Sequence, residues 1–459
     1  MAGFIKKIFF LICFFILLII VIFYFYKKKL QVSIAPKEPQ VYMTVLVHGS
    51  FGSLLGLLSI PNVIKDQIKG SLYAKINKRM RKDPIFYKDL PMLEKGFLKI
   101  EPTFDFLSTS TLRFAVYPIV KSYELVNDYL NYDKEKNYFY TFGWSGYLSQ
   151  QKRRAESIRL YNALSEEIER LNRQGVSPKV RLIAHSHGGN VSLNLGAIFK
   201  VLTSKSLDQL ETLSNNIDER SSLEQIFALM KQLPNKEGVR YHKGLRQYDY
   251  VPVNKNLEID ELIMLGTPIQ TETEGFCFSP IFKNVYNIYS EEDFIQQVDF
   301  VTTKKDYSGQ TLSSSILFEH KTEGSHLVQA KIAVKWQDII SKPSHKELWS
   351  PSWDKENDLS SYPLFPIPIV VFTPFIITYL NKLPKDVHDI DVTLKLGTKH
   401  LSIFGIPRLL RTTSPILPIK SNLKISTKFI EDIKTKMYLW KPANITQPGE
   451  LKAIMKYLL

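Results

Sequence analysis

One serine in the chain has the surroundings of a catalytic nucleophile. Ser186 lies in the pentapeptide Ala184–Gly188, which reads AHSHG and follows a β-branched, apolar stretch. A nucleophilic serine of this kind sits on a tight strand-to-helix turn that projects its hydroxyl above the sheet, so the residues two before and two after it must be small. Ala184 and Gly188 meet that requirement, and the apolar residues 190–203 favour the following helix. The pattern predicts that Ser186 attacks a carbonyl carbon.

A second, glycine-rich segment could stabilise the negative charge that acyl transfer builds on a carbonyl oxygen. It spans residues 48–52 (HGSFG) and follows a strand expected over Val41–Val47. Two backbone N–H groups must already point at such an oxygen. We expect one from His187, the residue after the nucleophile. The other is expected from the glycine-rich segment, where Ser50 is the first choice and Phe51 the second.

The elements that must position these residues alternate between strands and helices. This alternation predicts an α/β fold with a mostly parallel central sheet flanked by helices. Such sheets place their sites beyond the carboxyl ends of the strands, which is where the polar segments lie. The helix over 150–173 has one apolar face, and Gly175 can close it. Strands are expected at 41–47, 138–142, 179–184, 259–265, 284–289 and 327–336, with one more at 389–396.

Three segments together resemble the α/β-hydrolase superfamily and, within it, the lipases and esterases. They are Val45–Gly52 (VLVHGSFG), Leu182–Gly189 (LIAHSHGG) and Leu265–Pro268 (LGTP). The resemblance covers about residues 41–350. It implies the α/β-hydrolase fold, an acyl-enzyme on the serine, and a triad whose members follow in chain order serine, acid, histidine.

The resemblance places the triad acid just after the strand that follows Leu265–Pro268. Three acidic residues, Glu291, Glu292 and Asp293, follow the strand expected at 284–289. Asp293 is the best placed of the three, and Glu291 and Glu292 are the alternatives.

The triad histidine should follow the last core strand, where it takes the proton from the serine and returns it to the leaving group. His345 lies in the loop after the strand at 327–336 and opens a helix-like segment (HKELW). His326, immediately before that strand, is the alternative. His185 and His187 flank the nucleophile and are expected to point elsewhere.

An apolar run near the N-terminus predicts a membrane anchor. Ile8–Tyr26 is an unbroken apolar and aromatic stretch long enough for a helix that crosses the hydrocarbon core of a bilayer. A cleaved signal peptide is the alternative, but signal peptides have a shorter apolar core. Lysines flank the run on both sides, so the sequence does not decide on which side the rest of the chain lies.

The chain therefore divides into four parts, which are an anchor at 1–30, a linker at 31–40, a hydrolase domain at 41–350 and an extension at 351–459. The last hundred residues have no assigned role, and prolines in their apolar stretch at 364–380 argue against a regular spanning helix. Core packing is expected for this stretch, and a second membrane contact is the alternative. Two insertions, at about 54–135 and 204–258, are candidates for a lid.

Composition narrows the classes of partner and cofactor. The net charge is +15, but no basic run exceeds three residues and no nucleic-acid-binding motif is present, so we expect no nucleic-acid partner. If the charge has a role, membrane lipid is the better candidate. The two cysteines, Cys13 and Cys277, cannot plausibly pair. No HExxH motif or phosphate-binding loop occurs, so neither a metal nor another cofactor is expected.

These observations predict a serine hydrolase of carboxylic esters, with a lipid or acyl ester met at a membrane as substrate. Hydrolysis of thioesters or amides, and acyl transfer, would use the same triad. A catalytically inactive interaction protein that keeps the fold is the alternative from another class. The oligomeric state is left open.

Overall fold

A computed structural model gives the architecture of part of the chain. The N-terminal run Ile8–Tyr26, Ser50 and Phe51 lie outside the described residues. Within the described residues, no helix is long and apolar enough to cross a membrane. The structure describes residues 39–49, 97–100, 113–129, 135–144, 150–204, 217–232, 240–242, 247–249, 257–293, 296, 308–313, 326–336, 338–349, 367–383, 388–398 and 419–439.

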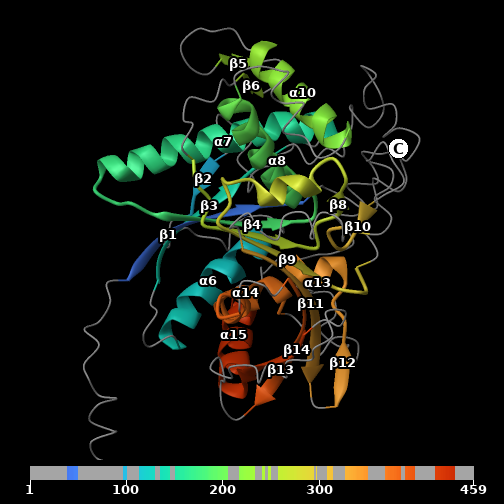
Figure 1. Ribbon diagram of the computed structural model, residues 1–459. Coiled ribbons are helices and arrows are strands. Elements are labelled where there is room, and N and C mark those ends of the chain that lie inside the picture. Colours follow the sequence, from blue (N-terminus) through green and yellow to red (C-terminus); the bar gives the residue numbers. More distant parts are fainter. Residues whose placement is uncertain are drawn as a thin grey trace, which may run out of the picture.

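A ten-stranded sheet runs through the molecule in the order β14-β13-β11-β9-β7-β4-β1-β3-β2, with β12 paired to β11 (Figure 1). The eight strands from β14 to β3 are parallel, whereas β2 and β12 are antiparallel to their neighbours. This confirms the predicted α/β class. The strands are β1 (Gln40–Val47), β2 (Phe97–Lys99), β3 (Glu135–Phe142), β4 (Lys179–His185), β7 (Glu261–Leu265), β9 (Asn284–Tyr289), β11 (His326–Trp336), β12 (Ile339–Ser341), β13 (Asp389–Thr398) and β14 (Ile419–Ser426).

Helices cover the sheet in two layers, and each layer has its own apolar core (Figure 1). One layer holds α7 (Gln150–Arg173), α8 (His187–Thr203) and α10 (Ile217–Gln232), with the 3-10 helix η2 (Glu274–Phe278). The other holds α6 (Arg113–Tyr129), η5 (Ile369–Phe372), α14 (Thr373–Leu380) and α15 (Thr427–Leu439). The short pairs β5 (Arg240–His242)·β6 (Gln247–Asp249) and β8 (Ile269–Gln270)·β10 (Ser308–Gly309) lie outside the main sheet.

The central strands are buried on both faces, which explains their composition. β7 (ELIML) is buried along its whole length, and β4 and β9 are buried except at their ends. Continuous β-branched and apolar runs are typical of parallel strands covered by helices on both sides. The strands predicted at 179–184, 259–265 and 284–289 and the helix at 150–173 are confirmed, and Gly175 follows that helix with φ +75°.

Residues on both sides of the predicted domain limits join the same core. Helix α6 lies inside the insertion expected at 54–135. It packs its Ile119 and Tyr123 into the core shared with η5, α14 and α15 rather than forming a separate lid. The described part of the apolar stretch at 364–380, residues 367–380, includes η5 and α14, whose Phe372 and Phe375 are fully buried. Core packing was therefore the right prediction for this stretch. Beyond residue 350, β13 and β14 extend the main sheet.

The strand order reverses at β1. The chain places β3 on one side of β1 and then returns to place β4 on the other. In open parallel sheets, ligands bind outside the carboxyl ends of the strands at such a reversal. Here β1 ends at Val47 and β4 at His185, so the reversal lies next to His48, Gly49 and Ser186.

Candidate active site

Ser186 occupies a strained turn between β4 and α8. Its backbone has φ 52° and ψ −134°, and it is the one non-glycine residue with positive φ in the described part of the chain. Its N–H donates to the carbonyl of Leu265 at 2.9 Å, and the residue is buried, with 5% exposure. Such a conformation costs on the order of 1–3 kcal/mol and is held only when the surrounding structure enforces it. A serine presented on this kind of turn is typical of a nucleophile elbow.

The glycines around Ser186 are required by close backbone approaches. A Cβ atom on Gly49 would lie 2.7 Å from Ser186 Cβ, and one on Gly188 would lie 2.5 Å from the carbonyl oxygen of His48. The segment after β1 therefore packs directly on the turn. This proximity brings His48 and Gly49, the described part of the predicted oxyanion segment, next to Ser186, and Ser50 lies outside the described residues.

The Gly-Thr-Pro segment after β7 packs against the start of α8. A Cβ atom on Gly189 would lie 2.0 Å from Thr267 Oγ1. Asn190 Nδ2 donates to the carbonyl of Pro268 at 3.0 Å, and Asn190 Oδ1 accepts a hydrogen bond from Thr273 Oγ1 at 2.9 Å. These contacts fix the end of β7 relative to the turn.

His48 anchors the segment after β1 through Trp144, a contact that the sequence did not predict. The Trp144 backbone N–H donates to His48 Nε2 at 3.2 Å, its indole N–H donates to the His48 carbonyl at 2.6 Å, and the two rings stack at 5.6 Å. Burial lowers the pKa of His48 to about 4, so the ring is neutral near pH 7. With Nε2 accepting, Nδ1 carries the proton and donates to the Gly49 carbonyl at 2.6 Å.

Asp293 and His345 form a buried acid–imidazole pair. His345 Nδ1 lies 2.9 Å from Asp293 Oδ1 and 2.8 Å from Oδ2. The Asp293 side chain is fully buried, whereas His345 keeps 17% of its side chain exposed. His345 is the first residue of α13 (His345–Trp349). A carboxylate on Nδ1 fixes the tautomer and leaves Nε2 available to exchange a proton.

Several hydrogen bonds hold Asp293 in place. Its N–H donates to the carbonyl of Ser290 at 3.0 Å, and Gln310 Nε2 donates to its carbonyl at 3.1 Å. The backbone N–H of Gln296 approaches Oδ1 at 3.4 Å. The carboxylate is therefore oriented toward His345 by the loop that follows β9.

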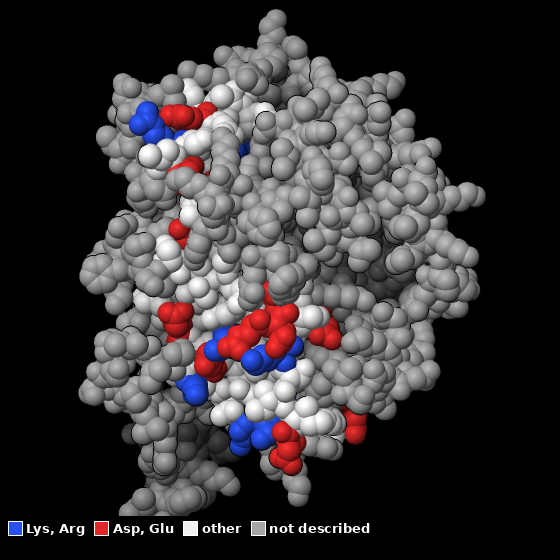
Figure 2. Space-filling model, turned by 90° about the vertical axis from the view of Figure 1, so that its right-hand side faces the viewer, with Lys and Arg blue, Asp and Glu red and all other residues white. Residues whose placement is uncertain are grey.

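The other acidic candidates turn away from this pair. Glu291 is an exposed residue whose carboxylate pairs with Lys331 at 2.8 Å and Lys342 at 2.5 Å. Hydrogen bonds from these two lysines lower the pKa of Glu291 to about 2. Glu292 is exposed as well. Figure 2 shows the side of the molecule on which β12 and α13 lie, with acidic and basic side chains intermixed.

His326, the alternative base, lies at the amino end of β11 and packs edge-on against Tyr286 at 6.2 Å. Because β11 is parallel to β4, His326 is at the edge of the sheet opposite to Ser186. Of the two candidates, His345 is the one at the edge that carries Ser186.

Gly266, at the end of β7, leaves room for the acid–imidazole pair close to the turn at Ser186. It has φ +58°, and a Cβ atom there would lie 2.6 Å from Asp293 Oδ2 and 3.2 Å from His345 Nδ1. The pair therefore packs against Gly266, directly after the last residue of β7. That last residue is Leu265, whose carbonyl accepts the N–H of Ser186. Among the described residues, no hydrogen bond joins Ser186 Oγ to His345. In unliganded enzymes such a bond is often long and tightens when substrate binds.

The expectation that His185 points elsewhere is wrong. His185 Nε2 lies 3.2 Å from the carbonyl oxygen of His345, and the two rings are 4.6 Å apart. The His185 ring also stacks on the Trp349 ring, with 5.3 Å between the ring centres. Burial lowers the pKa of His185 well below its usual value, and a positive charge on His345 lowers it further. His185 is thus a neutral ring packed between the turn and α13.

His187 begins α8 and is buried, with Asn190 Nδ2 at 3.3 Å from its Nδ1. Its backbone N–H lies at the N-terminus of the helix, where the helix dipole favours negative charge. This position agrees with the predicted oxyanion role.

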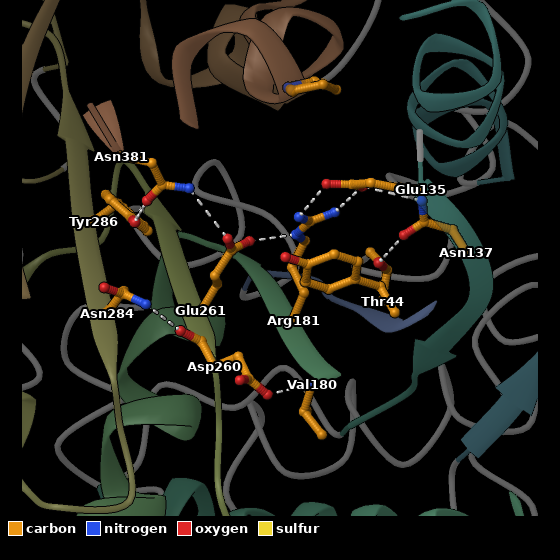
Figure 3. Close-up of polar contacts among 12 residues, drawn as sticks. Thr44, Glu135, Asn137, Val180, Arg181, Asp260, Glu261, Asn284, Tyr286 and Asn381 are labelled. Carbon is orange, nitrogen blue, oxygen red and sulfur yellow. Dashed lines mark hydrogen bonds and ion pairs between the residues drawn. The ribbon is translucent and has the colours of Figure 1, made fainter. Parts of the chain in front are cut away.

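A separate polar network lies at the amino ends of the strands (Figure 3). Arg181 of β4 is buried and pairs with Glu261 at 2.5 Å and with both oxygens of Glu135 at 2.8 and 3.0 Å. Its guanidinium lies 3.9 Å from the centre of the Tyr42 ring, and Asn381 links Glu261 to α14 at 3.4 Å. The network joins β1, β3, β4 and β7 across the sheet and lies at the edge away from Ser186.

Within the part of the chain that the structure describes, no group of three or more His, Cys, Asp or Glu side chains could hold a metal ion. Searches of protein-family models, of curated proteins and of solved structures found no match to this chain. The site consists of a strained serine turn and a buried acid–imidazole pair at one edge of the sheet.

Proposed function

We propose that the chain is a serine hydrolase of carboxylic esters, with Ser186 as nucleophile, His345 as general base and acid, and Asp293 as the residue that orients His345. One observation carries the proposal. Ser186 has a strained backbone at a strand-to-helix turn, and a fully buried carboxylate holds an imidazole beside that turn. Strain of this kind is retained at functional sites because the geometry serves the chemistry.

The proposed reaction has two halves. His345 Nε2 takes the proton of Ser186 Oγ as the oxygen attacks the ester carbonyl carbon, and the same proton then passes to the leaving alcohol as its C–O bond breaks. Water, deprotonated by His345, next attacks the acyl-enzyme, releases the carboxylic acid and restores the serine. Asp293 stabilises the imidazolium that forms twice. The N–H groups of His187 and Ser50 are the proposed donors to the oxyanion.

The α/β-hydrolase fold is part of this proposal. Serine, acid and histidine follow in the chain order of that fold, and the serine lies on the strand-to-helix turn that defines its nucleophile elbow. The reversal of strand order next to β1 supports a binding crevice at the same point. A lipid or acyl ester is the proposed substrate, because the apolar run Ile8–Tyr26 would hold the domain at a membrane.

An inactive interaction protein is the second candidate. The observation in its favour is that Ser186 Oγ and His345 share no hydrogen bond among the described residues. A thioesterase or an acyltransferase would use the same three residues and is separated from an esterase only by substrate.

Labelling with a fluorophosphonate probe, which reacts with activated serines, tests the proposal. The full chain should be labelled, the Ser186→Ala variant should not, and a Ser177→Ala variant should be labelled like the wild type. Ser177 is the matched control because it is exposed and precedes β4. If a wild-type chain with a cooperative unfolding transition stays unlabelled, the enzyme proposal fails and the interaction protein replaces it.

A further inference from the structure

Among the described residues, helices cover only one face of the sheet at its β13–β14 end. In β11 from residue 331 onward, and along β13 and β14, buried residues alternate with residues that are partly or fully exposed. The buried set packs against α14 and α15, while the α7–α8–α10 layer covers the central strands. Parallel strands are normally covered on both faces, so a face that no described helix covers is unusual. Its outward side chains include Lys331, Lys335, Lys395, Lys420 and Lys424.

Three of these lysines form one row across the sheet. Lys335 is in register with Lys395, and Lys395 with Lys424. Neighbouring strands are about 4.8 Å apart, and like charges directly opposite one another are destabilising. None of the three has an ion-pair partner among the described residues. Lys331, by contrast, is paired with both Glu291 and Asp391.

An exposed apolar side chain adjoins this row. Ile340 of β12 is in register with Lys335. Ile339 and Ile340 are 58% and 61% exposed, and the only other large apolar residue so exposed among those described is Ile217. Neighbouring strand residues point to opposite faces, so Ile340 shares the face of Lys335, whereas Ile339, in register with Trp336, lies on the other face. The exposed Ile340 has a hydration cost that burial in an apolar medium would remove.

The lysine row and the hairpin lie at the edge of the sheet that carries the candidate active site. β9 ends at Tyr289 opposite Lys331, whereas β11 continues to Trp336. At a rise of about 3.3 Å per residue, this continuation carries β11 about 16 Å beyond the end of β9. The chain then returns through β12 and reaches His345.

We propose that this face, defined by Lys335, Lys395, Lys424 and Ile340, docks on the surface of an anionic lipid bilayer. Lysines beside apolar side chains that enter the headgroup region are the combination that binds such surfaces. The phosphates of a nucleic acid would satisfy the lysines but leave Ile340 in water. A second copy would set one lysine row against another. The proposal concerns binding only and does not depend on catalysis by Ser186.

An environment-sensitive fluorophore tests the docking in the full chain reconstituted into lipid vesicles. An NBD label on Ile340→Cys should shift to shorter wavelength and brighten as phosphatidylserine replaces phosphatidylcholine, and lipid-borne quenchers should dim it. A label on Glu169→Cys, at an exposed position of α7, should do neither. The unsubstituted chain, labelled in parallel, gives the background from Cys13 and Cys277.

The charge requirement is tested by Lys335→Gln, Lys395→Gln and Lys424→Gln combined. Each lysine near an anionic surface contributes about fivefold, so the combined variant should weaken the docking equilibrium by roughly 100-fold. A control that removes the same charge at exposed Arg173, Lys382 and Lys428 should dock like the parent.

Equal responses at both label positions, or equal weakening by both charge variants, would overturn the proposal. All measurements are repeated with Ser186→Ala, so a failure of docking is distinguished from a failure of the proposed activity.

Discussion

Asp293 presents both carboxylate oxygens to the same ring nitrogen of His345, at 2.9 and 2.8 Å, from a position fully shielded from water. A buried carboxylate that faces one imidazole fixes the tautomer of that ring, which leaves Nε2 to accept a proton. Replacing only the charge of the carboxylate, and not its shape, therefore tests whether the pair serves catalysis.

Asp293→Asn should lower the rate of fluorophosphonate labelling by about 10³–10⁴-fold, because the amide favours the wrong tautomer of His345. The unfolding midpoint should change far less. Glu291→Gln is the matched control, since Glu291 pairs with exposed lysines instead. Its labelling rate should stay at the parental level. Normal labelling of the Asn variant would exclude Asp293 from the proposed triad.

Gly266→Ala should abolish labelling through a clash. The new Cβ would lie 2.6 Å from Asp293 Oδ2, so the carboxylate would have to move away from His345. Gly175→Ala separates this effect from backbone strain, because Gly175 also has positive φ but no atom lies within 4 Å of its Cβ position. We expect each variant to lose about 1–2 kcal/mol to strain, and only Gly266→Ala to lose labelling. Equal labelling in both variants would show that the site tolerates the displacement.

Stability should fall as the pH drops below 6.5. The pKa of His48 is lowered by burial from 6.5 to about 4, and that of His185 is lowered in the same direction. Below pH 6.5 the unfolded chain therefore binds protons on these two histidines that the folded chain does not yet bind. The stability is fully present above pH 6.5 and is lost on acidification. Each histidine contributes a slope of about 1.4 kcal/mol per pH unit in that window.

Denaturant unfolding between pH 6.5 and 4.5 measures this slope. His48→Gln and His185→Gln should each flatten it, because glutamine takes up no proton. An unchanged slope in both variants would mean that the two rings are protonated in the folded chain.

Arg181→Met should destabilise the fold by about 3–5 kcal/mol, because it leaves the carboxylates of Glu135 and Glu261 without their buried partner. Lys121→Met removes an exposed ion pair with Glu124 and should cost no more than about 1 kcal/mol. Equilibrium unfolding in urea compares the two. A similar small cost for both would show that water reaches the Arg181 network.

The sequence alone determined the features that depend on neighbouring residues. Ala184 and Gly188 flank Ser186 with small side chains, and a β-branched run precedes it, so the strand, the turn and the following helix were predictable from local pattern. Buried parallel strands such as β7 and β9 also show themselves as continuous apolar runs. The helix at 150–173 was predictable because its apolar residues repeat at helical spacing.

Tertiary structure decided what depends on distant residues. Asp293 and His345 are 52 positions apart, and His185 and His345 are 160 apart, so no local pattern separates His345 from His326 or shows that His185 contacts it. The partners of Arg181 come from β3 and β7, and the row of lysines comes from three strands whose register is set by sheet pairing. Periodicity shows which face a side chain takes, but only the packing of the sheet and helices decides what that face meets.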